Sequence, residues 1–210
     1  MEEARAAVVE AGLRLISDGL VEGTAGNVSV RFGDRVAISP SSIPYHLVRP
    51  EDVAVLDLDG NLIGEPGTAE PSSETGLHLG VYRQTGARAV VHHHGIRSVS
   101  VSTVVDELPP LHYYVVRLGG APRVAPYALY GSEKLARAVA AALDGRSAAL
   151  MQNHGAVTYG GSLDEAFERA RLLEWLCDLY LRATAVGRPR VLTDEELAEV
   201  AAAFATGYAR

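Results

Sequence analysis

Two short apolar runs, each followed closely by histidine, constrain the fold more than any other feature of the chain. Residues 89–91 lead directly into His92-His93-His94, and residues 148–151 precede Asn153-His154-Gly155. A short apolar run of this kind is typical of a buried strand. Alternate residues of a strand point to opposite faces, so the first and third histidines of the triplet are predicted to face one side and the middle one the other. Two such strand ends can bring three imidazoles to one point.

Three neutral imidazoles with an open fourth position are the ligand set that a catalytic zinc ion needs. The predicted ligands are His92, His94 and His154. The alternative is that these residues are only a polar strand end and a loop histidine. His93 is expected to face away from the metal, and His78 and His112 are further candidate ligands.

The spacing of apolar residues predicts a single domain over 1–210 with a central, mostly antiparallel β-sheet and helices on both faces, an α/β fold. Two capping boxes, at 162–165 and 193–196, predict the starts of a long helix and of a terminal helix. Helices are predicted over 9–20, 74–84, 98–105, 132–143 and 162–186 and from 194 onward, and strands over 28–32, 36–38, 53–58, 89–92, 113–116, 124–126, 148–151 and 156–159.

Composition narrows the class of protein. The net charge is −7, from 19 basic and 26 acidic residues, and no basic stripe is present, which argues against nucleic acid as a partner. No apolar run approaches the length of a membrane span, and the charged start of the chain is unlike a signal peptide. The single cysteine, Cys177, has no internal disulfide partner, which fits a reducing compartment. We therefore expect a cytoplasmic protein.

Three segments rich in hydroxyl groups or glycine are candidates for binding an anion. Pro71-Ser72-Ser73-Glu74 stands at a predicted helix start, where free N–H groups and hydroxyls suit a phosphate and a carboxylate can act as acid and base. The other two are residues 23–29, with two glycines, and residues 39–45, where prolines stiffen a serine-rich loop. The simpler interpretations are a helix cap, a plain connection and a polar turn.

Taken together, these segments resemble the class II sugar-phosphate aldolases, the group of L-fuculose-1-phosphate aldolase and L-ribulose-5-phosphate 4-epimerase, and the former most. The resemblance runs almost end to end. The segments that carry it are Gly23-Thr24-Ala25-Gly26-Asn27-Val28-Ser29-Val30-Arg31, Ile43-Pro44-Tyr45, Pro71-Ser72-Ser73-Glu74, Val91-His92-His93-His94, His112-Tyr113, Ala125-Pro126-Tyr127-Ala128 and Asn153-His154-Gly155. Their shared order makes the match specific.

The resemblance implies one zinc ion per subunit, held by the three histidines already named, and Glu74 as the catalytic acid and base, which can also lie at the metal in the free enzyme. It gives catalytic roles to Tyr113 and to Tyr208 near the chain end. It also implies a homotetramer with active sites between subunits. The residues implied to hold the substrate phosphate are Thr24, Asn27, Ser41, Ser42, Ser72 and Ser73.

The implied reaction is reversible cleavage of a ketose 1-phosphate of the L-fuculose 1-phosphate type to dihydroxyacetone phosphate and a small aldehyde such as L-lactaldehyde. Departures from the family pattern at Ser42, His93, Tyr130 and Arg117 lie mostly on the aldehyde side. They leave open an aldolase for 5-deoxyribulose or methylthioribulose 1-phosphate, or a related epimerase or dehydratase. A non-catalytic adducin-like interaction module is disfavoured because the ligands and Glu74 are all present.

Overall fold

A seven-stranded sheet organises the chain. The computed structural model describes residues 1–64 and 69–207, and the strand order is β3-β2-β1-β4-β7-β6-β5. Every neighbouring pair is antiparallel except β5 and β6, which run parallel. The predicted α/β fold with a mostly antiparallel sheet is confirmed. The strands are β1 (Asn27–Phe32), β2 (Arg35–Ile38), β3 (Ala54–Asp57), β4 (Ala89–His93), β5 (Val124–Ala125), β6 (Ala148–Met151) and β7 (Gly155–Gly160).

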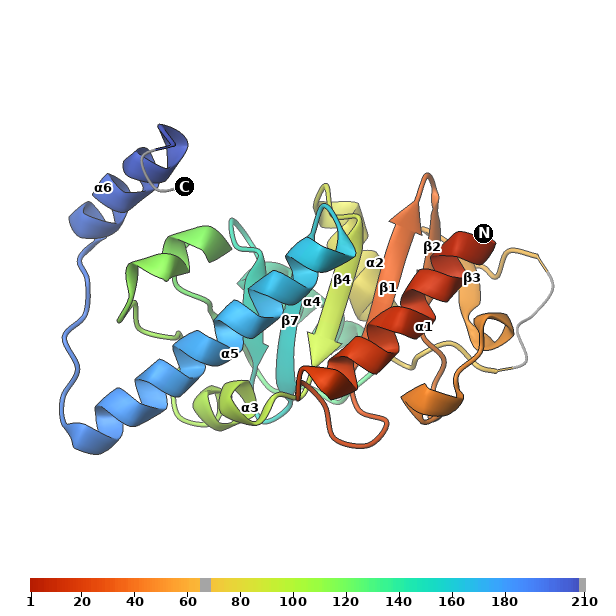
Figure 1. The fold of residues 1–210 in the computed structure, drawn as a ribbon, viewed down its shortest axis with the longest axis horizontal. Helices are drawn as coiled ribbons and strands as arrows, with labels where there is room; N and C mark the ends of the chain where they lie inside the picture. The colour runs from red at the N-terminus through yellow and green to blue at the C-terminus, as the bar shows by residue number, and fades with distance from the viewer. Residues whose placement is uncertain (65–68, 208–210) are drawn as a thin grey trace.

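Helices cover both faces of this sheet. In Figure 1, α1 and α5 cross the near face, and α2 and α4 lie behind it. The α-helices are α1 (Glu2–Ser17), α2 (Thr75–Gln84), α3 (Ile96–Ser102), α4 (Glu133–Ala142), α5 (Leu163–Val186) and α6 (Asp194–Ala205), and the 3-10 helices are η1 (Tyr45–Leu47), η2 (Pro50–Asp52) and η3 (Tyr113–Leu118). The ambiguous segment predicted as a helix over 98–105 is therefore helical, as α3.

Strand β4 shows how the sheet divides the core. Val90 packs in the cluster formed with α2 and α4, whereas Ala89 and Val91 pack in the cluster formed with α1 and α5. The alternation places His92 on the α2 face of the sheet and His93 on the α5 face. Both rings are completely buried. The end of β4 therefore presents one histidine toward the start of α2.

The prediction of a strand over 113–116 is wrong, because this segment forms the 3-10 helix η3. The His112 ring caps it by accepting a hydrogen bond from the Tyr114 N–H. Val115 and Leu118, three residues apart, are the buried positions, which suits the threefold repeat of a 3-10 helix. Gly119, with φ of 85°, then ends the helix. Of the β-branched and aromatic residues that suggested a strand here, Val115 is buried, whereas Tyr113 is 40% exposed.

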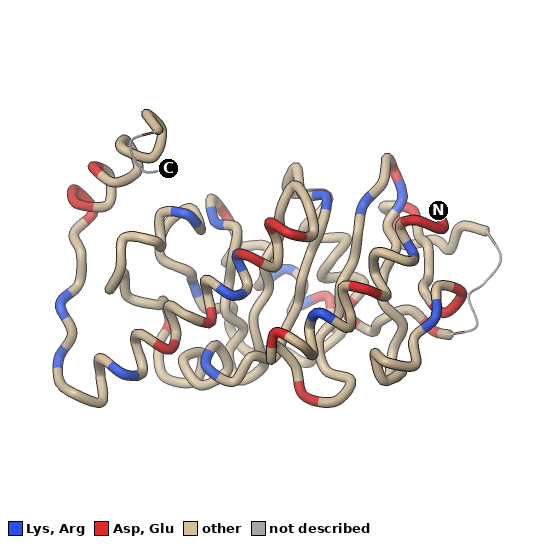
Figure 2. Tube along the Cα trace, in the orientation of Figure 1, with Lys and Arg blue, Asp and Glu red and all other residues tan. Residues whose placement is uncertain are grey.

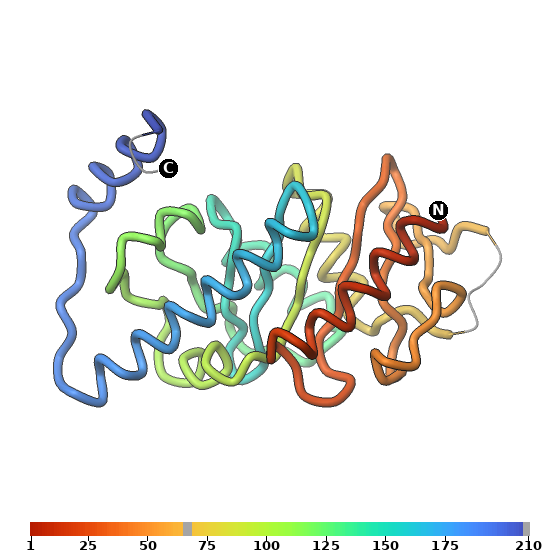
Figure 3. Tube along the Cα trace, viewed as in Figure 1, coloured from red at the N-terminus to blue at the C-terminus, as the bar shows by residue number. Residues whose placement is uncertain are grey.

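The last described helix stands apart from the sheet. Figure 3 traces the chain from α5 through residues 187–193 to α6 at one end of the molecule. None of the residues of α6 is buried within the described part of the chain. Figure 2 shows acidic and basic residues interspersed along α5, where Asp178 and Arg182 pair one turn apart at 2.9 Å. Among residues 1–64 and 69–207, no helix has the length and apolar character needed to cross a membrane.

A substitution of Gly12 on α1 tests how closely this helix packs against Tyr45, the residue hydrogen-bonded to the loop at 24–27. A Cβ atom there would lie 2.4 Å from the Tyr45 ring, and the Tyr45 hydroxyl donates to the Gly26 carbonyl at 2.7 Å. We expect Gly12→Ala to lower the free energy of unfolding by about 1–3 kcal/mol through overpacking. Gly80→Ala, in α2 with open space around it, is the control and is expected to stabilise by about 0.5–1 kcal/mol. Urea unfolding measures both, and equal effects would contradict the packing argument.

Candidate active site

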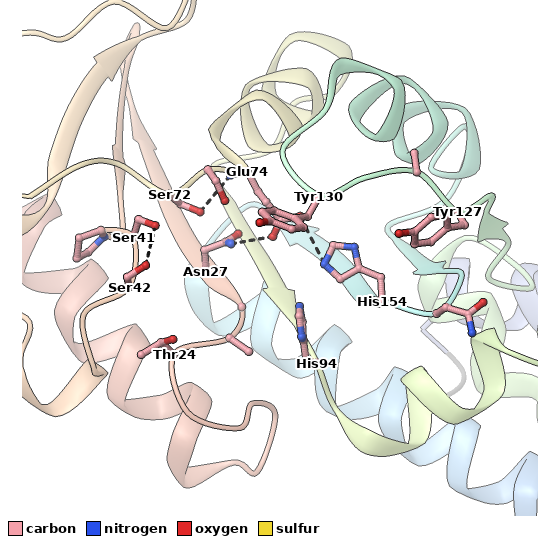
Figure 4. A pocket seen from close by; sticks show the side chains of 16 residues that line it. Thr24, Asn27, Ser41, Ser42, Ser72, Glu74, His94, Tyr127, Tyr130 and His154 are labelled. Atoms are coloured by element: carbon pink, nitrogen blue, oxygen red, sulfur yellow. Dashed lines mark hydrogen bonds and ion pairs between the residues drawn. The ribbon is translucent and has the colours of Figure 1, made fainter.

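A cavity of about 610 Å³ opens where six parts of the fold meet. They are the loop before β1, the loop after β2, the start of α2, the end of β4, the loop after β5 and the turn between β6 and β7. Figure 4 shows Thr24, Asn27 and the serines on one side of this cavity and His94 and His154 on the other, with Glu74 at its inner end.

Three histidine rings converge at the inner end. The ring centroids lie 4.8 Å apart for His92 and His94, 5.0 Å for His92 and His154, and 4.9 Å for His94 and His154, each pair edge to face. The first two come from the end of β4, and the third from the turn that leads into β7, the strand paired with β4. Pairing of these two strands therefore brings together histidines that are 60 residues apart.

The backbone fixes which nitrogen of His92 faces its neighbours. Its Nδ1 lies 2.9 Å from the carbonyl oxygen of Ala156, so Nδ1 carries the hydrogen and donates it. The Nε2 atom is then directed to the cluster, 3.0 Å from His94 Nε2 and 2.9 Å from Glu74 Oε2. This is the usual way in which a metal-ligating histidine is held in one tautomer.

Glu74 is a buried carboxylate at the N-cap of α2, with 6% of its surface exposed. Oε2 accepts a hydrogen bond from Asn27 Nδ2 at 3.1 Å. Oε1 lies 3.6 Å from His154 Nε2 and has no hydrogen-bond partner among the described residues. Burial by itself raises the pKa of Glu74, but attraction to His92 and the hydrogen bonds outweigh burial and hold the pKa below its usual range. The carboxylate is therefore ionised.

The surroundings keep two of the histidines neutral. Burial, together with repulsion from His92 and His154, lowers the pKa of His94 to about 3. Burial and repulsion from His92 also lower the pKa of His154. Neutral imidazole is the form of histidine that binds a metal ion.

This group of side chains suits a divalent cation. One ligand atom from each of Glu74, His92, His94 and His154 can be chosen so that all lie within 4.8 Å of one another. Three imidazoles and a carboxylate form a donor set of the kind used by zinc. The Oε1 atom of Glu74 is buried and has no hydrogen-bond partner among the described residues, so it is available as a ligand.

The other histidines considered from the sequence lie outside this group. His93 is buried on the opposite face, and its Nδ1 accepts a hydrogen bond from the Gly95 N–H at 3.3 Å. His78 lies behind Asn27 in the core, and His112 caps η3.

Gly155 allows the turn to approach the end of β4. A Cβ atom at this position would lie 2.3 Å from the backbone oxygen of His93 and within 3.2 Å of the rings of His94 and His92. The glycine that follows His154 is therefore a requirement of close packing between the two histidine segments.

The hydroxyl and amide groups predicted to hold a phosphate all line the same cavity. These six residues are Thr24, Asn27, Ser41, Ser42, Ser72 and Ser73. Gly26 in the first loop has φ of 73° and passes close to the His92 carbonyl, where a Cβ would lie 2.7 Å away. Ser42 also has a left-handed backbone, with φ of 62°. The residues predicted to bind an anion and the histidines therefore line one cavity.

The structure does not bring Tyr113 to this cavity. Tyr113 on η3 is 40% exposed, stacks on His112 at 4.4 Å between ring centroids and does not line the cavity. Tyr208 lies outside the described residues. Arg117 places its guanidinium 5.6 Å from the Tyr114 ring centre.

Sequence reasoning missed two other residues of the lining. Tyr127 faces the cavity from the loop after β5, and Asn153, with φ of 55°, forms the turn before His154. Tyr127 carried a weak signal, because it follows a proline in a loop between two predicted elements. Asn before His-Gly is also a turn signal, since Asn tolerates a left-handed backbone.

Comparisons with known proteins agree over nearly the whole chain. Residues 6–181 match the model of the class II aldolase and adducin N-terminal domain. The chain is 35% identical to the 5-deoxy-D-ribulose 1-phosphate aldolase of Bacillus thuringiensis, over 99% of this chain and 98% of that protein. It is 38% identical to the L-fuculose phosphate aldolase of Escherichia coli K12, over 95% and 93%. A solved L-fuculose 1-phosphate aldolase superposes with a TM-score of 0.92 at 33% identity, covering 98% of this chain and 97% of that one.

Gly155→Ala tests the approach of the two histidine segments. We expect the added methyl group to push the turn away from β4 and to weaken Zn²⁺ binding by about 10- to 100-fold, the range for changes to groups that orient metal ligands. Competition with a chelating dye measures the affinity. Gly86→Ala, with nothing within 4 Å of the added Cβ, is the control. Unchanged affinity in Gly155→Ala would show that the turn need not be so close.

Substitutions of Ser42 test the strain in the second loop. A left-handed backbone costs a residue with a Cβ about 1–2 kcal/mol, and glycine avoids this cost. We expect Ser42→Gly to be more stable than Ser42→Ala by about 1 kcal/mol in urea unfolding, since neither variant keeps the hydroxyl. Equal stability of the two variants would contradict a left-handed conformation at this position.

Proposed function

We propose a reaction for this chain, which belongs to the class II aldolase and adducin family and is an aldolase, a carbon–carbon lyase. The proposed reaction is the reversible cleavage of a ketose 1-phosphate of the L-fuculose 1-phosphate type. Its products are dihydroxyacetone phosphate and a small aldehyde such as L-lactaldehyde. One observation carries the proposal. The Glu74 and histidine group opens into the same cavity as the six hydroxyl and amide side chains. A phosphate and a reacting carbonyl can therefore occupy that cavity together.

The family is metal-dependent, and we assign the metal as one zinc ion per subunit. His92, His94 and His154 are its proposed ligands, and Glu74 is near enough to join them in the free enzyme. When bound, zinc acts as a Lewis acid that stabilises the negative charge left when the carbon–carbon bond breaks. The histidine tautomer fixed by Ala156 and the neutral state of His94 and His154 support this assignment.

The remaining chemistry belongs to side chains of this chain. The proposed phosphate-binding groups, Ser72 and its five partners, fix one end of the substrate by hydrogen bonds. Cleavage between C3 and C4 leaves the bonding electron pair on C3, and the C4 hydroxyl loses its proton to water as its oxygen becomes the aldehyde carbonyl. Glu74 takes up a proton from water and delivers it to C3, and it removes that proton in the synthetic direction. Lys134, the only lysine of the chain, is exposed on α4 and outside the cavity, which argues against a Schiff base.

Assembly into a homotetramer with sites between subunits is part of the proposal. The exposed helix α6 and the exposed ring of Tyr113 are what such contacts would cover. We assign Tyr113 and Tyr208 to the aldehyde end of a site completed by a neighbouring subunit. The buried thiol of Cys177 fits the reducing cytoplasm that we propose as the location.

A second candidate substrate is 5-deoxyribulose 1-phosphate, or its methylthio counterpart. Similarity to the Bacillus thuringiensis enzyme over 99% of this chain favours it. Both candidates share the phosphate-bearing half and differ only in the aldehyde released. Tyr127 and Tyr130, exposed on the loop that borders the other half of the cavity, are the residues we expect to decide between them.

The proposed function is tested by release of dihydroxyacetone phosphate from L-fuculose 1-phosphate by the zinc-loaded protein. We expect release to disappear after chelation and to return when zinc is added. Glu74→Gln is expected to lower kcat by about 10²- to 10⁴-fold, the usual contribution of a general acid or base. Glu10→Gln, on the exposed side of α1, is the matched control and is expected to keep full activity.

The outcomes separate the two substrates. Release from 5-deoxyribulose 1-phosphate but not from L-fuculose 1-phosphate would select the second candidate and keep the aldolase chemistry. Full activity after complete removal of metal, or in Glu74→Gln, would contradict the proposed mechanism.

A further inference from the structure

A buried chain of polar side chains extends from Glu74 into the core on the side away from the cavity. Asn27 lies next to Glu74, and His78 Nε2 lies 2.5 Å from Asn27 Oδ1. Ser29 Oγ then lies 2.6 Å from His78 Nδ1 and 2.7 Å from the Tyr82 hydroxyl. Asn27 is 5% exposed, and the other three members have at most 1% of their surface exposed. We call these four side chains the Asn27–Tyr82 chain.

Secondary-structure elements hold every residue of the Asn27–Tyr82 chain in place. Asn27 and Ser29 are alternate residues of β1 and share one face of that strand. Glu74, His78 and Tyr82 recur every four residues from the N-cap along one side of α2. The network therefore joins a central strand to the helix that begins at Glu74, with no loop residue between them.

The chemistry of the groups sets the direction of each hydrogen bond. The His78 ring is completely buried, and its two nitrogens meet the uncharged groups Asn27 Oδ1 and Ser29 Oγ, so the ring is neutral and has one N–H. With that hydrogen on Nε2, His78 donates to Asn27 Oδ1, and the Asn27 amide group donates to Glu74 Oε2. Ser29 then donates to Nδ1, and Tyr82 donates to Ser29. Every member is satisfied in this order.

The opposite order conflicts with the charge on Glu74. With the hydrogen of His78 on Nδ1, Nε2 becomes an acceptor and requires the amide group of Asn27. Asn27 Oδ1 would then face Glu74 Oε2 at the observed 3.1 Å, which places two acceptors against each other in a buried site. His78 thus determines which end of the Asn27 side chain Glu74 meets.

We propose that His78 is a positioning residue for the aldol reaction: its Nε2–H fixes the orientation of Asn27, and Asn27 in turn holds the Glu74 carboxylate at the atom where the proton is moved. This inference rests on the function proposed above. The His78 side chain does not line the cavity, and it reaches the Glu74 carboxylate only through Asn27; the backbone N–H of His78 donates to the Glu74 carbonyl as part of the helix. The Asn27–Tyr82 chain is not a route for protons to solvent, because the Tyr82 hydroxyl lies in the core, with 1% of the residue exposed.

Two substitutions of similar size separate positioning from packing. In His78→Gln, the side-chain amide can place an N–H where Nε2 stands, whereas in His78→Asn the shorter amide reaches only as far as Nδ1. We expect His78→Gln to keep kcat within about threefold of the parent. We expect His78→Asn to lower kcat by about tenfold, as for a lost buried hydrogen bond, with KM changed less than threefold.

A second kinetic measurement reports more directly on the proton transfer by Glu74. Exchange of the hydroxymethyl hydrogen of dihydroxyacetone phosphate with D₂O requires the proton transfer but no aldehyde. We expect this exchange to slow in His78→Asn by the same factor as kcat. Equal kcat in the two variants, or a raised KM with kcat unchanged, would overturn the positioning role.

The tautomer of His78 provides a readout independent of activity. In the zinc-loaded protein with ¹⁵N-labelled histidine, the signals missing from His78→Gln identify the His78 ring. We expect the Nε2–H form, and an Nδ1–H form would overturn the inference even if His78→Asn fails to fold. If the parent protein cleaves no ketose 1-phosphate, the proposed function fails while the tautomer still tests the hydrogen-bond order. If the parent is active and His78→Gln and His78→Asn have equal kcat, only the inference about His78 fails.

Discussion

The pairing of β4 with β7 is the constraint on which the site depends. It sets His92 opposite Val157 and brings the turn that holds His154 against the end of β4. The carbonyl of Ala156 then orients the His92 ring, and the absence of a side chain at Gly155 leaves room for all three rings. The antiparallel pairing of β4 with β7 thus sets the distances and angles between the three histidine rings and the tautomer of His92. These histidines are too far apart in the sequence for local structure to bring them together.

Glu74 shows how a buried charge is stabilised without an arginine or lysine partner among residues 1–64 and 69–207. It stands at the N-terminus of α2, where free N–H groups favour negative charge, and it accepts a hydrogen bond from Asn27. Burial lowers the pKa of His92, but Glu74 raises it by more, and the protonated ring supplies the remaining electrostatic attraction. A carboxylate held in this way keeps one oxygen uncommitted, since Oε1 has no hydrogen-bond partner in the described part of the chain. That oxygen faces the histidines.

Strand alternation was sufficient to predict that His92 and His93 lie on opposite sides of β4, but not that His93 is completely buried. The helix start at Glu74 was also predicted from the sequence, whereas the turn formed by Asn153 was not. Periodicity failed at 113–118, where β-branched residues pack in a 3-10 helix capped by His112. It could not find the Asn27–Tyr82 chain, because a pattern gives the face on which a residue lies but not the partner it meets across the core. The places of Tyr113 and Tyr208 in the site stay predictions.

The two sides of the cavity are built by different connections of the chain. The hydroxyl-rich side comes from the loops around residues 24–27, 41–42 and 72–73, which are tied to β1, β2 and α2. The opposite side comes from the loop after β5, where Tyr127 and Tyr130 are more than half exposed. Tyr127 and Tyr130 belong neither to the core cluster packed on the sheet nor to the group of Glu74 and the histidines, so substitutions of these two side chains leave both in place. Selectivity can therefore diverge between related proteins while the reaction centre and the stability of the fold stay unchanged.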